Sequence, residues 1–391
     1  MKIIYITAFD FSGANAASKR VINNLEALLA NHIEVKVFSL FGKEKNYIEM
    51  LKEGKIQVTS IEKSPQRKLN FFASAAIRIK AIFKLLDFIK KDNDFTHIIL
   101  YSGYSIFSLP LLLARYFKNF KLLFDSVEFY EPKNIFETFS FVNIDRYLAN
   151  RILFFTFDGI IVISKFLENH FIQKTIWGAP KVIRIPPLIG QEPRLKKIHF
   201  GKGFRPIKLI YAGEIGKNKD RLEEFLDAYL DFIQNSKLFH ITLIGENHNE
   251  LQKIRSYRTL KDKFPSSLKI INRRITLEEV RDKVAESHFV VFFREKNLIS
   301  IAGFPTKFVE ALSQGTPVIT NDVGDIINFI EDGENSFISN NKKEEIKSKL
   351  AMIASLEANK YMQISQNAFH TSLQFNYTKY KKPLYKFLKD I

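Results

Sequence analysis

Short apolar runs typical of buried β-strands alternate with longer segments of helical spacing, and this alternation runs through the chain twice. In the first half, a strand pattern at residues 2–7 precedes a segment in which Val21 and Leu25 share one helical face. In the second half, a strand pattern at residues 208–212 precedes a helical pattern at 220–234. A strand, a helix and a further strand form a right-handed crossover, which yields parallel sheets. The alternation therefore predicts an α/β protein with two Rossmann-like domains facing across a cleft.

A segment rich in proline and glycine separates the two halves and marks a linker. It runs from Pro186 to Lys202, and proline and glycine favour turns and irregular backbone. We place the first domain at 1–187, the linker at 188–204, the second domain at 205–372 and a final helical segment at 373–391. The other expected strands are 35–40, 56–61, 97–101, 121–124, 159–163, 183–185, 240–244, 268–271 and 289–293, and the other expected helices are 16–30, 69–91, 165–171 and 276–286.

The chain has few residues suited to bind a metal. Cysteine is absent, so neither a disulfide framework nor a thiolate metal site is expected, and the eight histidines show no ligand spacing. Asp92-Asn93-Asp94 has the spacing of a metal-binding Asp-x-Asp segment. It lies between a predicted helix end and a predicted strand, where Asp and Asn favour turns. We therefore interpret it as a turn and expect no metal site.

No segment has the pattern of a membrane span or a secretory signal. The most apolar candidate, residues 98–117, contains Gly103, Pro110 and Arg115, and its pattern predicts a strand, a loop and a helix. The apolar run near the start is too short for a signal peptide and is interrupted at Asp10. A cytoplasmic location is the expectation.

The formal net charge is +17, which favours anionic partners without choosing among them. The basic residues are spread along the chain without an arginine-rich tail, so no nucleic-acid partner is expected. The predicted helix at 69–91 is basic, rich in Phe and Ile, and acidic only at Asp87. Such a helix can lie on an anionic membrane surface, or it can pack on the sheet with its lysines in solvent. Both interpretations stay open.

The segment 303–338 has the pattern of a loop, a short helix, a buried strand and a second helix. Pro305 suits the first helical turn. The free N–H groups of that turn, at Thr306 and Lys307, can hold an anion, and Glu310 lies one turn further on the same face. Amides for phosphates and a carboxylate for ribose hydroxyls together can bind a nucleotide sugar. An ordinary capped helix fits the same spacing.

This segment resembles the donor-site motif of family-4 glycosyltransferases, most densely over residues 294–338 and more loosely along nearly the whole chain. The resemblance implies the GT-B architecture, with the donor on the second domain, the acceptor on the first, and a C-terminal helix that packs back on the first domain. It implies transfer with retention from a nucleotide-sugar donor to a glycan or lipid-linked acceptor. It also implies that neither a metal nor another cofactor is used.

Ligands of open α/β sheets bind beyond the carboxyl ends of the strands, so the residues after each expected strand are candidates. Gly13 follows the first strand, and the resemblance implies a glycine loop here that closes over the donor phosphates. A plain strand-to-helix turn is the alternative. Asp125 directly follows the expected strand at 121–124, and we expect its carboxylate to orient an acceptor hydroxyl. The alternative is a reciprocal helix cap with Glu128.

The phosphate-binding loop of the family is only partly matched. Gly213 and Lys219 stand where the family has its glycine and lysine, but Glu214 stands where the family has an arginine. A leaving diphosphate needs positive charge nearby. We therefore expect Lys219 and Arg294 to supply it, with Lys307 and Arg274 as weaker candidates.

The acidic pair of the family is incomplete as well. Glu310 matches the second glutamate, whereas Ala302 stands in the place of the first. Only Glu310 is therefore carried over, as the expected ribose ligand.

The function that follows is sugar transfer in the cytoplasm or on the inner face of the cytoplasmic membrane, in bacterial surface polysaccharide synthesis. A sugar epimerase or a phosphorylase on the same fold is one alternative. A polyanion- or nucleic-acid-binding protein with altered catalysis is another, because two family positions differ.

Overall fold

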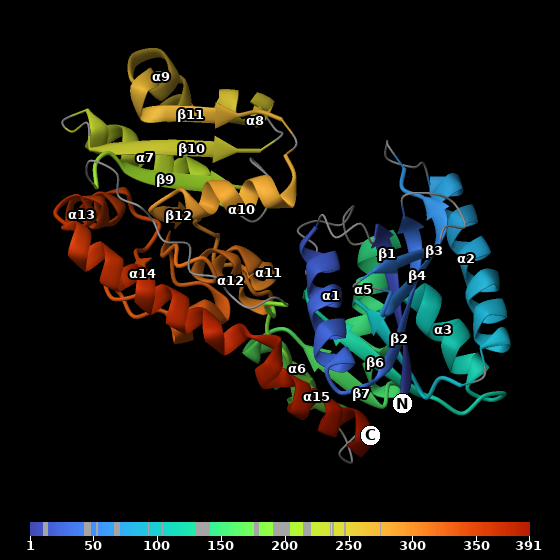
Figure 1. The fold of residues 1–391 in the computed structure, drawn as a ribbon. Helices are drawn as coiled ribbons and strands as arrows, with labels where there is room; N and C mark the ends of the chain where they lie inside the picture. The colour runs from blue at the N-terminus through green and yellow to red at the C-terminus, as the bar shows by residue number, and fades with distance from the viewer. Residues whose placement is uncertain are drawn as a thin grey trace. The chain divides into compact units, whose positions relative to one another are not determined.

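The computed structural model describes every residue except 11–14, 43–47, 52–53, 66–70, 93, 104, 130–140, 176–179, 191–203, 214–219, 235, 237, 246–247 and 274. Its backbone divides into two compact units (Figure 1). The first unit comprises Met1–Gly190, Ala302–Phe304 and Tyr377–Ile391, and the second comprises Gln191–Ile301 and Pro305–Asn376.

The first unit is built on an eight-stranded sheet in the order β3-β4-β2-β1-β5-β6-β7-β8. All neighbouring strands are parallel except β3, which runs antiparallel to β4. The strand order reverses between β1 and β5, which makes this the switch point of the sheet. The strands are β1 (Lys2–Asp10), β2 (Glu34–Gly42), β3 (Ile48–Leu51), β4 (Ile56–Lys63), β5 (His97–Tyr101), β6 (Lys121–Ser126), β7 (Gly159–Val162) and β8 (Lys181–Arg184).

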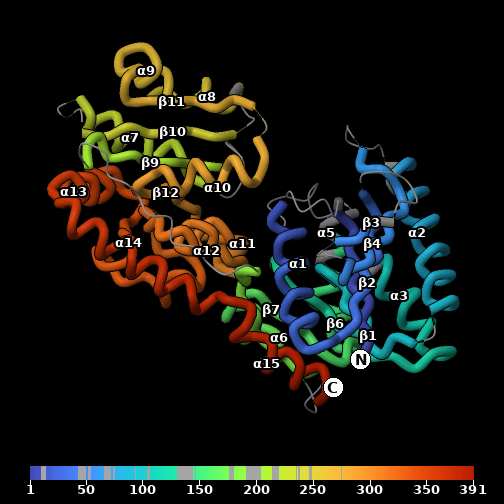
Figure 2. The backbone as a smooth tube through the Cα atoms, in the orientation of Figure 1, coloured from blue at the N-terminus to red at the C-terminus, as the bar shows by residue number. Residues whose placement is uncertain are grey.

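Helices cover both faces of this sheet (Figure 2). Along the sheet, the connection through α1 runs in one direction, and the connections through α2, α3, α5 and α6 run in the opposite direction. Since such connections are right-handed, α1 lies on one face of the sheet and the other four helices lie on the opposite face. Since both faces are covered, all five residues of β5 are buried. The helices are α1 (Ala16–Leu29), α2 (Phe71–Lys91), α3 (Ser105–Ala114), α5 (Phe141–Arg151), the 3-10 helix η1 (Leu153–Thr156), α6 (Lys165–Lys174) and α15 (Tyr377–Asp390).

The last helix, α15, belongs to the first unit and packs against α1. Asn31 donates a hydrogen bond from its side-chain amide to the carbonyl of Lys381 at 2.8 Å. Gly159 in β7 lets Phe387 of α15 approach the sheet, because a Cβ on Gly159 would lie 2.8 Å from the phenyl ring. The apolar face of α15 is thus buried against the first unit.

The second unit has a six-stranded, fully parallel sheet in the order β11-β10-β9-β12-β13-β14. The strand order reverses between β9 and β12, so their carboxyl ends form the switch point of this sheet. The strands are β9 (Ile207–Ala212), β10 (Phe239–Ile244), β11 (Leu268–Ile271), β12 (Phe289–Val291), β13 (Val318–Thr320) and β14 (Phe337–Ile338).

Helices on both faces of the second sheet enclose its core. Helix α7 contacts α9 and α13, and α12 contacts α14. Phe225, Tyr229 and Phe293 stack in the interior, beside strands whose residues are almost all buried. The helices are α7 (Leu222–Ile233), α8 (His248–Lys253), α9 (Arg255–Lys263), α10 (Leu277–Ala285), α11 (Leu298–Ala302), α12 (Thr306–Leu312), α13 (Lys343–Ala354) and α14 (Ala358–Ser372), with the 3-10 helices η2 (Pro265–Ser267), η3 (Gly324–Phe329) and η4 (Leu373–Phe375).

This architecture confirms the predicted fold class, an α/β protein with two Rossmann-like units on parallel sheets. The apolar segment 98–117 forms β5, a turn and α3, as its pattern predicts. Within the described part of the chain, no helix combines the length and the apolar character needed to cross a bilayer.

Several elements differ from the sequence expectations. The second helix expected after β13 is only the 3-10 helix η3, and the helix expected from residue 220 begins at Leu222. The sequence patterns do not predict β3, α5, α8, α9, α11, α13, α14 or β14. Helices α8 and α9 have only six and nine residues, which is too short for a clear apolar repeat. The apolar residues of η3 have helical spacing. The helix nevertheless has only six residues, because it begins at Gly324 and a turn follows at Gly333.

Candidate functional site

Asp220 is the centre of a polar cluster at the carboxyl edge of the second sheet. Its carboxylate accepts hydrogen bonds from Nε of Arg294 at 3.2 Å and from the hydroxyl of Tyr211 at 3.0 Å, and it forms an ion pair with Lys307. Only 7% of the Asp220 side chain is exposed, against 12% for Arg294 and 22% for Lys307. We call these four residues the Asp220 cluster. It combines two cations with one carboxylate and therefore carries a net positive charge.

Three adjacent parallel strands bring this cluster together. Tyr211 lies in β9, Arg294 follows β12, and Asn321 follows β13 directly. The amide of Arg294 donates to Oδ1 of Asn321 at 2.9 Å, and the Asn321 side chain donates back to the Arg294 carbonyl at 2.8 Å. Since parallel neighbours end at the same edge of the sheet, the fold fixes the backbone of Arg294 at the switch point.

Gly213, the residue after β9, leaves space for the side chain of Lys307. A Cβ at Gly213 would overlap the Lys307 ammonium and lie 2.9 Å from Cε. The ammonium also lies 4.5 Å from the centre of the Tyr211 ring, within the range of a cation–π contact. Because Gly213 has no side chain, the ammonium group of Lys307 can lie directly beside its backbone.

The surroundings shift the pKa values of two members of the cluster. Burial by itself raises the pKa of Asp220, but Lys307 and Arg294 outweigh it and hold that pKa below its ordinary value. Burial lowers the pKa of Lys307 by more than the attraction of Asp220 raises it. Lys307 and Arg294 share the single buried carboxylate of Asp220. A second anion beside Lys307 would therefore stabilise the charged form of this lysine.

The carboxyl edge of the second sheet also offers hydrogen-bond donors that such an anion could use. Among the described residues, no hydrogen bond is found to the two terminal nitrogens of Arg294. Helix α12 begins at Thr306 after Pro305, which is the N-cap residue rather than the first helical residue expected. The first amides of a helix have no partner within it, and this holds for Thr306 and Lys307. Glu310 is half-buried one turn further along α12, and its role as a ribose ligand stays a prediction.

In the first unit, Asp125 is completely buried and fully occupied by the protein itself. It accepts hydrogen bonds from Nη2 of Arg20 at 2.7 Å, from Nε of Arg20 at 3.1 Å and from the hydroxyl of Tyr5. Nη1 of Arg20 donates to the carbonyl of Ile185 at 2.9 Å. Burial disfavours the charge of Arg20, yet Asp125 raises its pKa above the ordinary value. This geometry is that of a buried ion pair, and the expected role of Asp125 in orienting an acceptor stays a prediction.

The structure brings together three of the predicted site residues, Gly213, Arg294 and Lys307, with Thr306 and Glu310 on the same helix as Lys307. Gly13 and Lys219 lie outside the described residues, as do Glu214 and Arg274. Ala302, which replaces the first family glutamate, is completely buried, and its carbonyl accepts a hydrogen bond from Ser164 at 2.6 Å.

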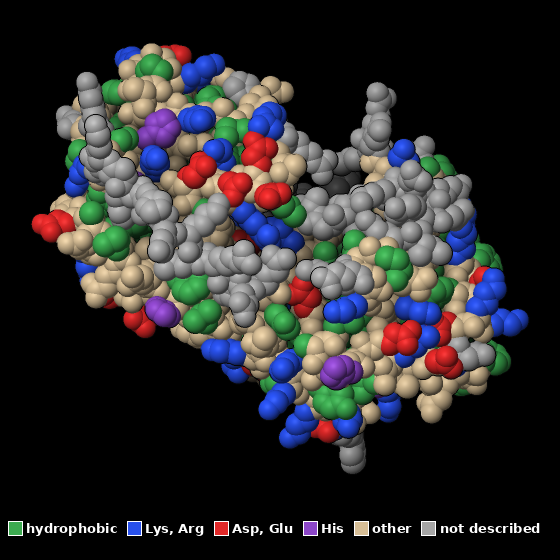
Figure 3. Space-filling view, in the orientation of Figure 1, with side chains coloured by type: hydrophobic (Ala, Val, Ile, Leu, Met, Phe, Trp, Pro, Cys, Tyr) green, Lys and Arg blue, Asp and Glu red, His purple; other side chains and the backbone are tan. Residues whose placement is uncertain are grey.

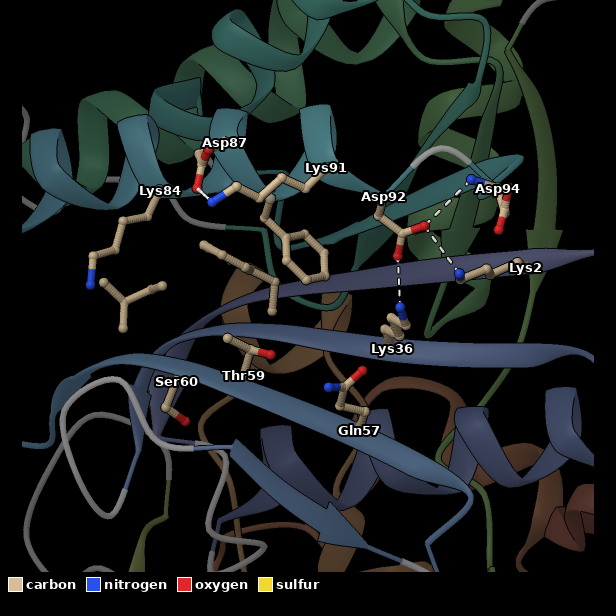
Figure 4. Close-up of a pocket in the computed structure, with 13 residues that line it drawn as sticks. Lys2, Lys36, Gln57, Thr59, Ser60, Lys84, Asp87, Lys91, Asp92 and Asp94 are labelled. Carbon is tan, nitrogen blue, oxygen red and sulfur yellow. Dashed lines mark hydrogen bonds and ion pairs between the residues drawn. The ribbon is translucent and has the colours of Figure 1, made fainter.

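A cleft of about 700 Å³ lies in the first unit between α2 and strands β2 and β4 (Figure 4). Asp92 stands at one end of it and pairs with Lys2 at 3.0 Å and with Lys36 at 2.8 Å. Lys2 is the first residue of β1, so this end of the cleft lies at the amino edge of the sheet, opposite to the edge where ligands of such sheets bind. In the described ranges, no group of three or more His, Cys, Asp or Glu residues is placed to hold a metal ion.

Two residues of the site, Asp220 and Asn321, are not among those that the sequence predicts. Asp220 was expected to begin a helix, but it forms an isolated bridge with Arg294 ahead of α7. Asn321 follows a predicted strand directly, so the strand-end rule that singled out Asp125 and Arg294 applies to it equally.

Residues 206–355 match the family model of group 1 glycosyl transferases. The matched region contains the whole Asp220 cluster together with Gly213, Thr306 and Glu310. No curated protein matches the chain by sequence. The Asp220 cluster thus lies within the part of the second unit that is similar to group 1 glycosyl transferases.

Solved structures with the same fold span the full chain. Sucrose-phosphate synthase from Thermosynechococcus elongatus is 12% identical with a TM-score of 0.69, and the alignment covers 100% of this chain and 99% of that one. HepE from Anabaena, in complex with UDP, is 14% identical with a TM-score of 0.68 and full coverage of both chains. A glycosyltransferase from Rickettsia africae is 14% identical with a TM-score of 0.67, covering 100% of this chain and 98% of the other. At these identities the comparisons show the fold, which is the GT-B fold.

Proposed function

We propose that this chain is a glycosyltransferase that moves a sugar from a nucleotide-sugar donor to a glycan or lipid-linked acceptor, with retention and without a metal ion. The group 1 domain match and the GT-B fold support the reaction class. HepE has been solved with UDP and with UDP and glucose, so UDP and its sugars are the first donors to test.

The observation that carries the proposal is the Asp220 cluster. Arg294 and Lys307 converge at the carboxyl edge of the second sheet, and the first amides of α12 lie beside Lys307. A diphosphate carries negative charge that increases as the sugar leaves, and cations fixed in advance stabilise that charge without reorganisation. Arg294 and Lys307 therefore replace the charge missing at Glu214, with Lys219 as a further cation. Glu310 holds the ribose hydroxyls.

The reaction conserves the configuration of the anomeric carbon. The acceptor hydroxyl attacks that carbon on the face from which the diphosphate departs, while the bond between the carbon and the phosphate oxygen breaks. The electron pair of that bond stays on the phosphate oxygen, which takes the proton of the acceptor hydroxyl. The role of the protein is to bind the diphosphate and to stabilise its charge, so the buried Asp125 is assigned no proton transfer.

The setting proposed is bacterial surface polysaccharide synthesis, in the cytoplasm or at the inner face of its membrane. A lipid-linked acceptor in that membrane would bring the reaction to a lipid surface. The abundance of Lys, Ile, Asn and Phe is consistent with an AT-rich bacterial genome.

The test measures UDP binding by calorimetry with the full chain and three variants. Arg294→Gln and Lys307→Gln each remove one cation, and we expect the dissociation constant to rise about tenfold or more, since a charge-assisted hydrogen bond contributes roughly 1.5–3 kcal/mol. Lys360→Gln removes an exposed lysine of the same unit that pairs with Glu334, and its affinity should equal that of the wild type. If all three variants bind like the wild type, the cluster is not the donor site.

Product analysis separates the proposed activity from the related enzyme classes. A transferase links the sugar to the acceptor, whereas an epimerase returns an altered nucleotide sugar without transfer, and a phosphorylase requires inorganic phosphate. The anomeric configuration of the product, read by NMR, tests retention. A chain that binds no nucleoside diphosphate, but binds nucleic acid with steep salt dependence, would contradict the transferase proposal.

A further inference from the structure

The outer face of α2 is apolar where a surface helix is ordinarily polar. Phe72, Ile79 and Phe83 occupy one helical stripe and are 81%, 54% and 69% exposed. Such a helix would usually turn its apolar stripe to the core and its charges to water. On α2 the stripe that faces away from the sheet therefore exposes apolar side chains to solvent.

The next helix repeats this arrangement. Leu109 and Leu113 of α3 are 50% and 65% exposed, and Tyr116 and Phe117 in the turn that follows are 86% and 92% exposed. Leu113 lies four positions after Leu109, and Tyr116 and Phe117 lie three and four positions after Leu113. Helical repeats with these spacings group side chains on one face. Two adjacent aromatic rings that are almost fully exposed protrude from the surface rather than line a groove.

A third helix extends the same surface. Ile144 and Tyr147 of α5 are 41% and 51% exposed, and Phe155 of the adjoining η1 is 56% exposed. Helix α3 contacts both α2 and α5, and the three helices follow crossovers of the same direction, so they form one layer on one face of the sheet. Exposed apolar areas that extend over several elements usually mark an interaction site.

The charge of this layer favours an anionic partner. Residues 71–91, 105–120 and 141–156 together contain nine basic and two acidic residues. Along the right-hand edge of Figure 3, where Figure 1 places α2, apolar and basic side chains alternate at the surface. A second copy of the chain would bring the same positive charge against this face. An anionic lipid bilayer instead offers an apolar interior for the rings and negative headgroups for the lysines.

We propose that the α2–α3–α5 layer of the first unit docks on an anionic membrane surface, with Tyr116 and Phe117 as the main anchors. The attachment is interfacial, since no helix of the described residues is suited to span a bilayer. The inference does not depend on the donor site, which lies in the second unit.

Sedimentation of the full chain with lipid vesicles tests the proposal. We expect binding to vesicles of phosphatidylcholine with 30% phosphatidylglycerol to be at least tenfold tighter than to phosphatidylcholine alone, and to weaken in 0.5 M NaCl. The double variant Tyr116→Ser/Phe117→Ser should lose about tenfold in affinity for the anionic vesicles, with an unchanged melting temperature. The control variant Met352→Ser/Met362→Ser removes exposed apolar side chains of the second unit and should bind like the wild type.

Three results would overturn the proposal. One is equal vesicle binding by the wild type and the Tyr116/Phe117 variant. Another is no preference for the anionic vesicles. The third is self-association, measured by analytical ultracentrifugation, that the Tyr116/Phe117 variant abolishes while vesicle binding persists, which would assign the layer to a second copy. UDP binding serves as a separate readout, so a failure of the donor-site proposal leaves this one testable.

Discussion

Arg294 donates a hydrogen bond from Nε to Oδ1 of Asp220 at 3.2 Å, across 74 positions of sequence. The bond uses the inner nitrogen of the guanidinium, and none of the residues that the structure describes bonds to the two terminal nitrogens. Asp220 therefore acts as a positioning residue: it orients Arg294 and holds Lys307 beside it. An arginine that is held in place by a carboxylate and by Asn321 needs little rearrangement to bind a diphosphate.

Replacing Asp220 by asparagine should lower the free energy of unfolding at pH 7 by about 2 kcal/mol, the range of a hydrogen bond to a charged group. The pKa of Asp220 is lower in the folded chain than in the unfolded chain. Its contribution to stability is therefore complete well above the unfolded pKa, near 4, and is lost as the pH falls through the folded pKa. Urea unfolding of both proteins between pH 7 and pH 3.5 should show the difference narrowing below about pH 4. A difference that stays constant down to pH 3.5 would contradict this.

Gly213→Ala should weaken UDP binding while the fold persists. The added methyl group would overlap the end of the Lys307 side chain, which is flexible and can move away. The cation then leaves the cluster, and we expect a loss of roughly tenfold in affinity, as for the loss of one charge-assisted bond. Calorimetry of Gly213→Ala, Lys307→Gln and the double variant checks the cause. The double variant should bind no worse than Lys307→Gln alone, whereas additive losses would show that Gly213 acts by another route.

The buried ion pair of the first unit leads to a prediction about stability rather than catalysis. Arg20→Met leaves the carboxylate of Asp125 without its cation in the core, and we expect a loss of about 3–5 kcal/mol in the free energy of unfolding. Tyr5→Phe removes only one hydroxyl donor and should cost about 1–3 kcal/mol. Denaturant unfolding measures both.

The turnover number of Tyr5→Phe tests the role of Asp125 separately. If the carboxylate is structural, this variant should keep the kcat of the wild type at a temperature where both are folded. A large fall in kcat with unchanged folding would return Asp125 to the acceptor site, as the sequence alone suggested.

The periodic features of the sequence were sufficient to predict the framework of the fold. Helix α1 and strand β5 agree with the predicted bounds within one residue, because each combines a continuous apolar pattern with clear ends. Short elements such as α8 have too few residues for a period to emerge, and β3 depends on pairing with β4 rather than on its own pattern.

The site was predictable only in part, because its contacts are long-range. Arg294 and Lys307 could be identified as cations after a strand and at a helix start. That both of them contact Asp220 depends on which strands are neighbours in the sheet. The sequence around a single residue does not determine this order. The same limit applies to Asp125, whose partner Arg20 is 105 positions away. A carboxylate at a strand end looks alike in sequence whether it faces a ligand or a buried arginine.

His288 provides a pH-dependent contribution to the stability of the second unit. Its Nδ1 accepts a hydrogen bond from the amide of Lys208 at 2.9 Å, and the ring packs between Phe204 and Tyr361. Burial, and to a smaller extent the charge of Lys208, lowers the pKa of His288 to about 4. The folded chain therefore keeps this imidazole neutral, whereas the unfolded chain binds a proton near pH 6.5.

The difference between the folded and unfolded pKa values of His288 determines how the stability changes with pH. Below about pH 6.5 the unfolded state takes up a proton that the folded state does not, so stability falls as the pH decreases and levels off below about pH 4. Between pH 7 and pH 5 this residue alone should remove about 2 kcal/mol. The variant His288→Asn keeps an acceptor for the Lys208 amide but does not titrate. It should be less stable than the wild type at pH 7, and urea midpoints should show that this deficit shrinks as the pH falls to 5. Parallel pH profiles for the two proteins would mean that folding does not lower the pKa of His288.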